Sequence, residues 1–224
     1  MNKIFLNKTI PGKTMFRKTV FAGTALFAAL VAIPQARAEA PAPKGGISAP
    51  GAVQAGRYTV EPYHTQVEFT LMHMGFTAFS GFFSQASGTL VLDPAHIEAT
   101  KLDVTLPIAS VQTTAAKLDS ELKSADWFDA AKYPSARFVS THVTRTGSST
   151  ATITGDLTLH GVTRPVTLKA RLIGSGVNPL DKKETVGFEG STVISRSAFG
   201  VSRYVPLVGD QVTLHIAGAF EKAS

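Results

Sequence analysis

The sequence predicts an all-β domain, an eight-stranded antiparallel barrel with a short helix inserted between strands. Apolar and polar residues alternate in segment after segment, as in 66–71 and 163–172, which is typical of strands with one face in water. Turn signals such as Asp93-Pro94 and His160-Gly161 separate these segments. The alternation is interrupted at length only over 113–134. Because closure removes the exposed edges of such a sheet, a barrel is expected.

The eight expected strands follow one another along the chain, with the longest break over 113–134. Pro107 lies within the third of them and argues for an edge position or a bulge there, since proline cannot donate to a strand ladder. The expected strands are 57–72, 79–92, 98–110, 135–146, 149–160, 163–177, 184–195 and 211–221.

The interruption predicts the one helix. Thr113 or Thr114 is expected to cap it, because a threonine hydroxyl can accept a free N–H of the first turn. Leu118, Leu122 and Ala125 would share its apolar face. Two large aromatic residues follow directly, and they are expected at one mouth of the barrel.

The N-terminus predicts an export signal over residues 1–38. A basic segment is followed by an apolar run over 19–33, which is short for a bilayer span, and then by small residues before Ala38. Cleavage after Ala38 and a periplasmic location are expected; an uncleaved anchor is the alternative. Either Met1 or Met15 could start translation, because a complete signal also begins at Met15.

Composition and charge limit what the remaining chain can do. Residues 39–56 are rich in Ala, Pro and Gly and predict a flexible tether, followed by one domain over 57–224. Six of the 22 basic residues precede residue 39, which leaves 16 against 16 acidic residues. The neutral domain lacks the basic field that nucleic acid requires. The chain has no cysteine, and therefore no disulfide, thiol chemistry or lipid-modified cysteine.

No motif predicts a metal or a catalytic site. His64 and His73 are nine residues apart, so on one regular strand they would point to opposite faces, and no third ligand stands at a usual spacing. The sequence has no Gly-x-Ser-x-Gly elbow, His-Glu-x-x-His or phosphate-binding loop. Asp126 and Asp129 are expected to flank and solubilise an aromatic pair. We therefore predict no metal and no catalytic residues.

Five segments in order resemble the YceI family of exported, lipocalin-like, polyisoprenoid-binding proteins. The resemblance covers nearly all of 57–224 and implies a barrel with a long-chain isoprenoid or similar amphiphile in its interior, often in a dimer. The chain departs from the family pattern at Glu61, at 117–122 and at Ala198. The matching segments are Tyr58–His64 with His73, Gly81–Phe83 with Gly88–Leu90, Ser124–Asp129 with Tyr133-Pro134 and Phe138, Gly155–Val166, and Ser195–Gly200 with Val208–Val212.

Large apolar side chains are the candidate lining of that interior. Two interpretations of Trp127 and Phe128 are open: they plug the core, or they form a gate over a channel. Four phenylalanines over 76–83 indicate a barrel mouth that is lined by aromatic side chains. The expected lining residues are Phe69, Leu71, Phe79, Phe82, Leu90, Leu106, Trp127, Phe128, Phe138, Leu157, Leu168, Phe188, Phe199 and Leu214.

Three side chains are the candidate contacts for a ligand head group. His73 has the parity of an inward-facing residue, so it is either a satisfied interior histidine or a polar contact. Arg196, with Arg203 seven residues on, could hold a phosphate with two hydrogen bonds, because guanidinium matches phosphate geometry. The alternative for Arg196 is a structural ion pair.

The sequence therefore predicts a carrier or binder of an amphiphilic lipid, a polyisoprenoid or a quinone, that performs no chemistry. No cofactor is expected beyond that bound lipid. A homodimer and a membrane redox partner are the further partners considered, and nucleic acid is excluded. Two alternatives stay open: an enzyme that acts on such a lipid, using His73 at its head group, and a solid-core barrel that serves a membrane redox protein.

Overall fold

The computed structural model describes residues 53–223. The expected signal peptide over 1–38 and most of the expected tether over 39–56 lie outside the described residues. The folded domain already includes Val53, which is buried, and Gln54, whose carbonyl accepts a 2.7 Å hydrogen bond from the Tyr58 hydroxyl. The domain thus begins a few residues before the expected boundary.

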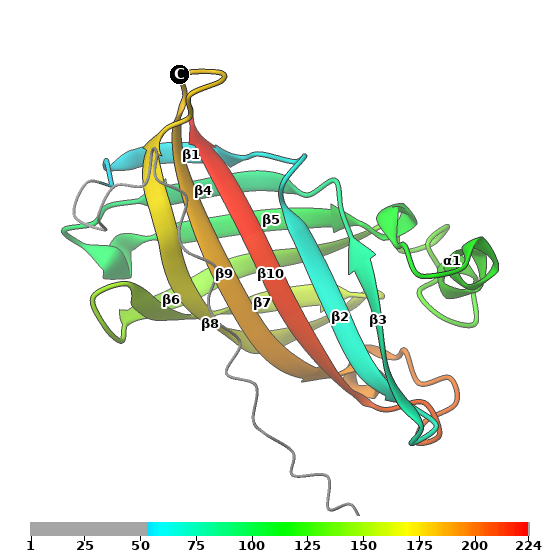
Figure 1. Ribbon diagram of the computed structural model, residues 1–224. Helices are drawn as coiled ribbons and strands as arrows, with labels where there is room; N and C mark the ends of the chain where they lie inside the picture. The colour runs from blue at the N-terminus through cyan, green and yellow to red at the C-terminus, as the bar shows by residue number, and fades with distance from the viewer. Residues whose placement is uncertain (1–52, 224) are drawn as a thin grey trace, which may run out of the picture. The chain divides into compact units, whose positions relative to one another are not determined.

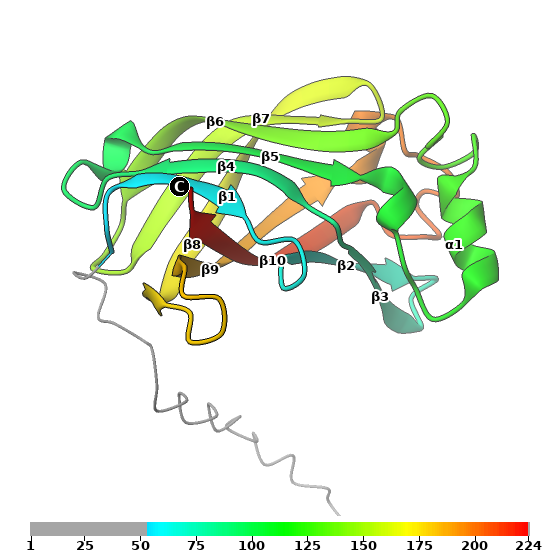
Figure 2. The same cartoon turned by 90° about the horizontal axis from the view of Figure 1, so that it is seen from above.

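The strands form the expected closed, eight-stranded antiparallel barrel (Figures 1 and 2). The ring runs β1-β4-β5-β6-β7-β8-β9-β10, and β10 pairs back with β1. The β2–β3 hairpin extends the sheet beyond β10. The strands are β1 Gly56–Val60, β2 Gln66–His73, β3 Thr77–Phe83, β4 Ser87–Leu92, β5 Lys101–Pro107, β6 Ser135–Arg145, β7 Thr150–Leu159, β8 Val162–Val177, β9 Glu184–Ser195 and β10 Gln211–Lys222.

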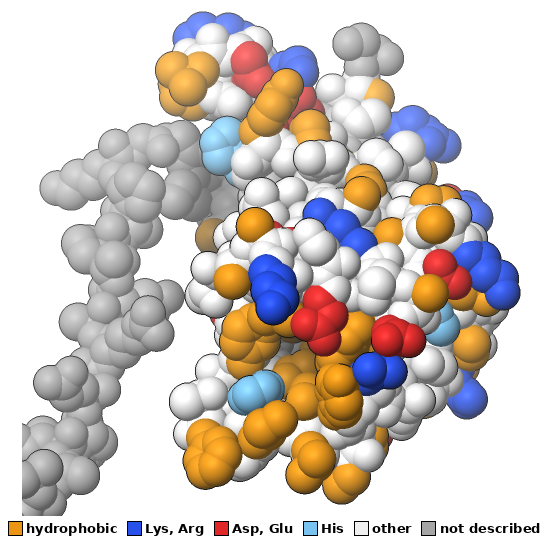
Figure 3. Space-filling model, turned by 90° about the vertical axis from the view of Figure 1, so that its right-hand side faces the viewer, with side chains coloured by type: hydrophobic (Ala, Val, Ile, Leu, Met, Phe, Trp, Pro, Cys, Tyr) orange, Lys and Arg blue, Asp and Glu red, His pale blue; other side chains and the backbone are white. Residues whose placement is uncertain are grey.

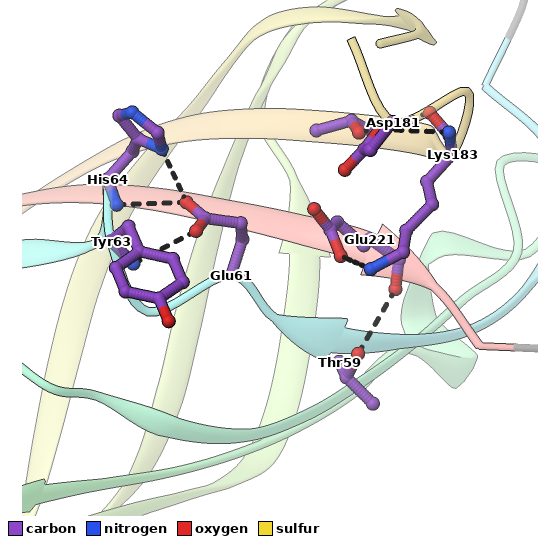
Figure 4. A network of polar contacts seen from close by, with 8 residues as sticks. Thr59, Glu61, Tyr63, His64, Asp181, Lys183 and Glu221 are labelled. Atoms are coloured by element: carbon purple, nitrogen blue, oxygen red, sulfur yellow. Dashed lines mark hydrogen bonds and ion pairs between the residues drawn. The ribbon is translucent and has the colours of Figure 1, made fainter.

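Two of the expected strands are each broken in two. The strand expected over 57–72 is β1 and β2, and the strand expected over 79–92 is β3 and β4. In the first break, the Glu61 carboxylate accepts hydrogen bonds from the backbone N–H groups of Tyr63 and His64, both at 2.9 Å (Figure 4). This side chain provides the acceptors that a neighbouring strand would otherwise supply, and it holds a turn where Pro62 has no N–H to donate.

Short helices cover the region between β4 and β6. The expected strand 98–110 is shorter than predicted, because 3-10 helices take up both of its ends: η2, Ile97–Ala99, and η3, Ile108–Ser110. The single α-helix of the described chain, α1, spans Ala116–Lys123. Pro107 is the last residue of β5, next to η3.

The expected cap of α1 is wrong in detail. Ala115 occupies the N-cap position and makes no side-chain cap. Thr113 instead donates its backbone N–H and its hydroxyl to the Asp119 carboxylate, at 2.7 and 2.6 Å. Of the expected apolar face, Leu122 is buried and Leu118 half-buried, but Ala125 is exposed. No helix within residues 53–223 is long and apolar enough to cross a membrane.

The interior of the barrel has two parts. At the end covered by α1 and the 3-10 helix η4, Arg196–Phe199, apolar side chains pack into a solid cluster. The other end has a smaller buried set that surrounds an open space. The buried members of the solid cluster are Phe69, Ile108, Val111, Leu122, Trp127, Leu159, Ile194, Phe199, Val201, Val208 and Val212.

Candidate functional site

The open space is a cavity of about 240 Å³ inside the barrel. All eight strands of the ring contribute to its wall, which is almost entirely apolar. Inward residues of β8 show why: Val166, Leu168, Ala170 and Leu172 alternate with exposed polar neighbours, so the period of two places every second apolar side chain on the wall. The site is therefore built from strand periodicity rather than from a local motif.

The volume limits what the cavity can hold. An apolar cavity of roughly 150 Å³ in another protein stays dry and accepts a benzene-sized molecule. At the same volume per atom, 240 Å³ corresponds to about ten carbons. Wall atoms of an empty apolar cavity lack contact partners on one side, so an apolar ligand would restore lost dispersion contacts.

Seven of the fourteen expected lining residues lie on the cavity wall. They come from seven strands, one from each of β4 to β10. These residues are Leu90, Leu106, Phe138, Leu157, Leu168, Phe188 and Leu214. These seven side chains face the cavity, and their contact with a ligand stays a prediction.

The other seven expected lining residues are not on this wall. Phe82 is 39% exposed and lies on β3, outside the closed ring of strands, where its backbone bridges to Gln112. The remaining six pack in or against the solid cluster, and several of its aromatic rings meet at 5.7–6.5 Å. These six are Phe69, Leu71, Phe79, Trp127, Phe128 and Phe199.

The aromatic pair after α1 is a plug. Trp127 is buried, its ring N–H donates to the Glu121 carboxylate at 3.2 Å, and its ring meets Tyr204 edge-on. Phe128 packs edge-on against Phe83. Because both aromatic rings pack against neighbouring rings, Trp127 and Phe128 close the α1 end of the barrel. The cavity approaches the surface at the other end.

Arg196 is not available to a ligand head group. Its guanidinium is 4% exposed and donates to four backbone carbonyls at 2.7–2.9 Å. These carbonyls, of Val201, Arg203, Val208 and Gly209, belong to the loop that precedes β10. Burial lowers the pKa of Arg196, and the nearby Asp210 carboxylate opposes this shift. Arg196 holds this loop, so neither the head-group role nor a simple ion pair describes it.

His73 and Arg203 also lie at the plugged end, away from the cavity wall. His73 is exposed, not inward as its parity predicts, because β2 has run past the barrel at this point and pairs with Val208 through one isolated bridge. Arg203 pairs with Asp126 at 3.1 Å and lies over the Tyr204 ring. The three head-group candidates are thus neighbours of one loop, but they do not face the cavity.

Sequence reasoning missed Arg145, the last residue of β6, which lines the outer end of the cavity. Its guanidinium donates to the Pro94 carbonyl at 2.9 Å. Within residues 53–223, no carboxylate lies at ion-pair distance from it. Strict alternation counted from the buried Phe138 would place Arg145 on the outer face of β6. A register shift between Ser140 and His142 reverses this alternation, so Arg145 lies on the same face as the buried Val143.

No metal site is evident in the described part of the chain. His64 precedes β2 in the Glu61 turn, and its ring Nδ1 lies 2.8 Å from the Glu61 carboxylate, whereas His73 ends the same strand. Residues 53–223 hold no group of three His, Asp or Glu side chains that could bind a metal ion.

The fold and the cavity define a class of protein, a closed β-barrel with an apolar interior cavity. A family model described as the YceI-like domain matches residues 58–220. The chain belongs to the YceI-like family. A UPF0312 protein of Pseudomonas savastanoi pv. phaseolicola is 41% identical over 153 residues, which are 67% of this chain and 79% of that protein.

Solved structures agree with this assignment. The crystal structure of Burkholderia cenocepacia BcnA has a TM-score of 0.65 and 27% identity, and the match covers 71% of this chain and 98% of BcnA. A polyisoprenoid binding domain from Saccharophagus degradans, implicated in plant cell wall breakdown, has a TM-score of 0.56. It is 12% identical, with 76% of this chain and all of that domain covered, and so shows a shared fold.

Proposed function

We propose that this protein binds and carries an amphiphilic long-chain lipid, a polyisoprenoid or a quinone, in the barrel cavity and performs no chemistry on it. The apolar cavity of about 240 Å³ is the observation that carries the proposal. The shared fold with a domain whose ligand class is polyisoprenoid supports it. The proposed location is the periplasm, on the strength of the N-terminal sequence pattern.

The energetics favour a ligand whose tail is buried and whose head remains near the surface. Each buried methylene contributes about 0.8 kcal/mol, so about ten of them contribute about 8 kcal/mol. Association offsets part of this gain through lost translational and internal motion. Contacts outside the cavity are therefore needed for tight binding, and a chain longer than about ten carbons would extend past the outer end.

Arg145 supplies a contact for the head group at that outer end. Its guanidinium has one carbonyl partner, that of Pro94, and lies on the boundary of the cavity. Guanidinium binds phosphate through charge-assisted hydrogen bonds. A polyprenyl phosphate with its tail in the cavity would bring its head group into this region.

The first experiment is native mass spectrometry of the exported protein, purified from its own cell envelope, followed by extraction and analysis of the lipid. We expect one isoprenoid or quinone adduct per chain. Ala170→Phe, which places a ring on the inner wall, should remove the adduct, whereas Lys169→Phe, the outward neighbour on β8, should keep it. A bare wild-type mass that quinones and polyprenyl phosphates do not change would contradict the proposal.

A second experiment tests the head-group contact. Arg145→Gln should weaken binding of a polyprenyl phosphate by about tenfold, the effect of one lost charge-assisted hydrogen bond, and leave a neutral quinone with the same tail unaffected. Titration of both ligands against wild type and variant measures this. Arg203→Gln, at the plugged end, is the matched control. An equal loss for both ligands would remove Arg145 from the head-group site.

The described structure favours none of the other functions considered. Of the polar side chains expected to act on a ligand, Arg196 is held by loop carbonyls and His73 lies away from the cavity. An enzymatic role therefore has no supporting observation. A homodimer and a membrane redox partner stay predictions of the sequence.

A further inference from the structure

Exposed apolar side chains gather at one corner of the molecule. They belong to the end of β2, the turn between β2 and β3, and the loop before β10. Figure 3 shows hydrophobic side chains collected in the lower part of that face. Phe76 is 85% exposed and Leu207 is 65% exposed. We call this set the apolar tip, and its members are Met72, Met74, Phe76, Tyr204, Val205 and Leu207.

The backbone holds these side chains in solvent. The Met74 N–H donates to the Leu207 carbonyl, and the Gly209 N–H donates to the Met72 carbonyl, both at 2.8 Å. The tight turn is possible because Gly75 adopts a φ of +74°. Arg196 fixes the other side of the loop through its four carbonyl bonds. The two segments thus form one braced unit, and neither backbone segment can move away from the other without breaking these bonds.

Charge is distributed around the tip in a way that suits a lipid surface. Residues 69–83 and 197–209 contain no Asp or Glu. Two charged groups beside the tip pair with each other, the Arg203 guanidinium and the Asp126 carboxylate from the loop after α1. The guanidinium lies 4.8 Å from the centre of the Tyr204 ring. Aromatic residues with a polar end, together with arginine, favour the depth of lipid head groups, while Phe and Leu favour the acyl region.

We propose that the apolar tip docks this protein on the surface of a phospholipid bilayer, with Phe76 and Leu207 inserted among the acyl chains. The tip is a protruding corner of the molecule (Figure 1). A two-fold contact between copies would require the tip to be self-complementary, and a partner protein would need a pocket of matching shape. A bilayer adapts to the protrusion, and neither segment of the tip carries a carboxylate that would repel anionic lipids, while the neighbouring Asp126 is paired with Arg203.

Docking by the tip orients the cavity. The turns that border the outer end of the cavity lie at the end of the molecule opposite the tip in both ribbon views (Figures 1 and 2). A protein docked by its tip would therefore present that end away from the bilayer surface. This inference goes beyond the proposed lipid cargo, because it concerns a surface that does not contribute to the cavity wall.

The test is flotation of the exported protein with vesicles of phosphatidylethanolamine and phosphatidylglycerol. The wild type should float with the vesicles, and Phe76→Ser with Leu207→Ser should lower its partition coefficient at least about tenfold. Leu180→Ser is the matched control, because Leu180 is 90% exposed in the β8–β9 turn, away from the tip. Its partition should equal that of the wild type. Cavity ligand binding and urea unfolding should be unchanged in all variants.

Three outcomes would overturn the proposal: no flotation of the wild type, equal flotation of the double variant, or an equal loss in Leu180→Ser. Trp127 provides an independent readout, since it is the single tryptophan of the chain and its ring centre lies 6.1 Å from that of Tyr204. Brominated lipids should quench its fluorescence in the wild type and not in the double variant. A crosslink from position 76 to an envelope protein, without flotation, would replace the bilayer with a protein partner.

Discussion

At the scale of single residues, Arg196 shows how one side chain can hold a whole loop. The loop before β10 has no strand partner for several of its carbonyls, and the buried guanidinium provides the donors they lack. Arginine suits this task because its five N–H donors have a fixed geometry and its charge strengthens each bond. The Trp127 ring, 5.4 Å away, packs over the same group. The plug and the loop thus depend on one residue.

Replacement of Arg196 by leucine should destabilise the protein by about 3–5 kcal/mol, because the buried carbonyls would lose their donors together. Urea unfolding measures this. Arg164→Leu is the control, since the exposed Arg164 donates to a single carbonyl, that of Ala198, and should cost less than about 1 kcal/mol. A large loss of lipid binding with unchanged stability would instead restore Arg196 as a head-group contact.

At the scale of elements, the turn between β1 and β2 depends on the ionised Glu61 carboxylate. Burial raises the pKa of Glu61, but hydrogen bonds from the Tyr63 and His64 N–H groups and from the His64 ring outweigh it, so the pKa lies below its usual value. A carboxyl group with a lowered folded pKa stabilises the fold above its unfolded pKa, about 4.3 for glutamate, and this contribution is lost as pH falls through the lowered value.

Glu61→Gln should therefore cost about 1 kcal/mol at pH 7, because the neutral amide accepts hydrogen bonds less strongly than the carboxylate. The difference from wild type should shrink as pH drops below about 4. Urea unfolding at pH 7 and pH 3 measures both values, with Glu98→Gln as the control for an exposed carboxylate. A difference that stays constant with pH would show that the charge of Glu61 is not what holds the turn.

The strands were the part of the structure that periodicity could predict. In β10, and in β8 as far as Leu172, the alternation matches the wall residues, because a strand keeps its parity until a bulge interrupts it. The same rule fails at Arg145 and at His73. A bulge in β6 reverses the parity of Arg145, and β2 leaves the barrel before His73. Both deviations are set by pairing between distant segments, which a local pattern does not contain.

At the scale of the whole molecule, the barrel is solid at one end and hollow at the other. Sequence reasoning treated all inward apolar residues alike, so it could identify Leu168 and Phe199 as interior but not separate wall from plug. The difference arises from the side chains that fill the centre of the barrel. At one end, aromatic rings from β2, β3 and the segment after α1 meet. At the other end, the strands carry smaller residues such as Ala151 and Ala170.

This asymmetry means that the hollow end gains most from a bound lipid. A ligand at 100 times its Kd stabilises a protein by about 2.7 kcal/mol, and each kcal/mol shifts Tm by about 2–4 °C for a domain of this size. Removal of the lipid should therefore lower Tm by about 5–10 °C, as calorimetry of loaded and delipidated protein would show. In Ala170→Phe, whose added ring occupies the cavity, the same extraction should leave Tm unchanged. Equal melting of the two wild-type samples would mean that the cavity wall supports itself without a ligand, and the interior would then be part of the scaffold rather than a binding site.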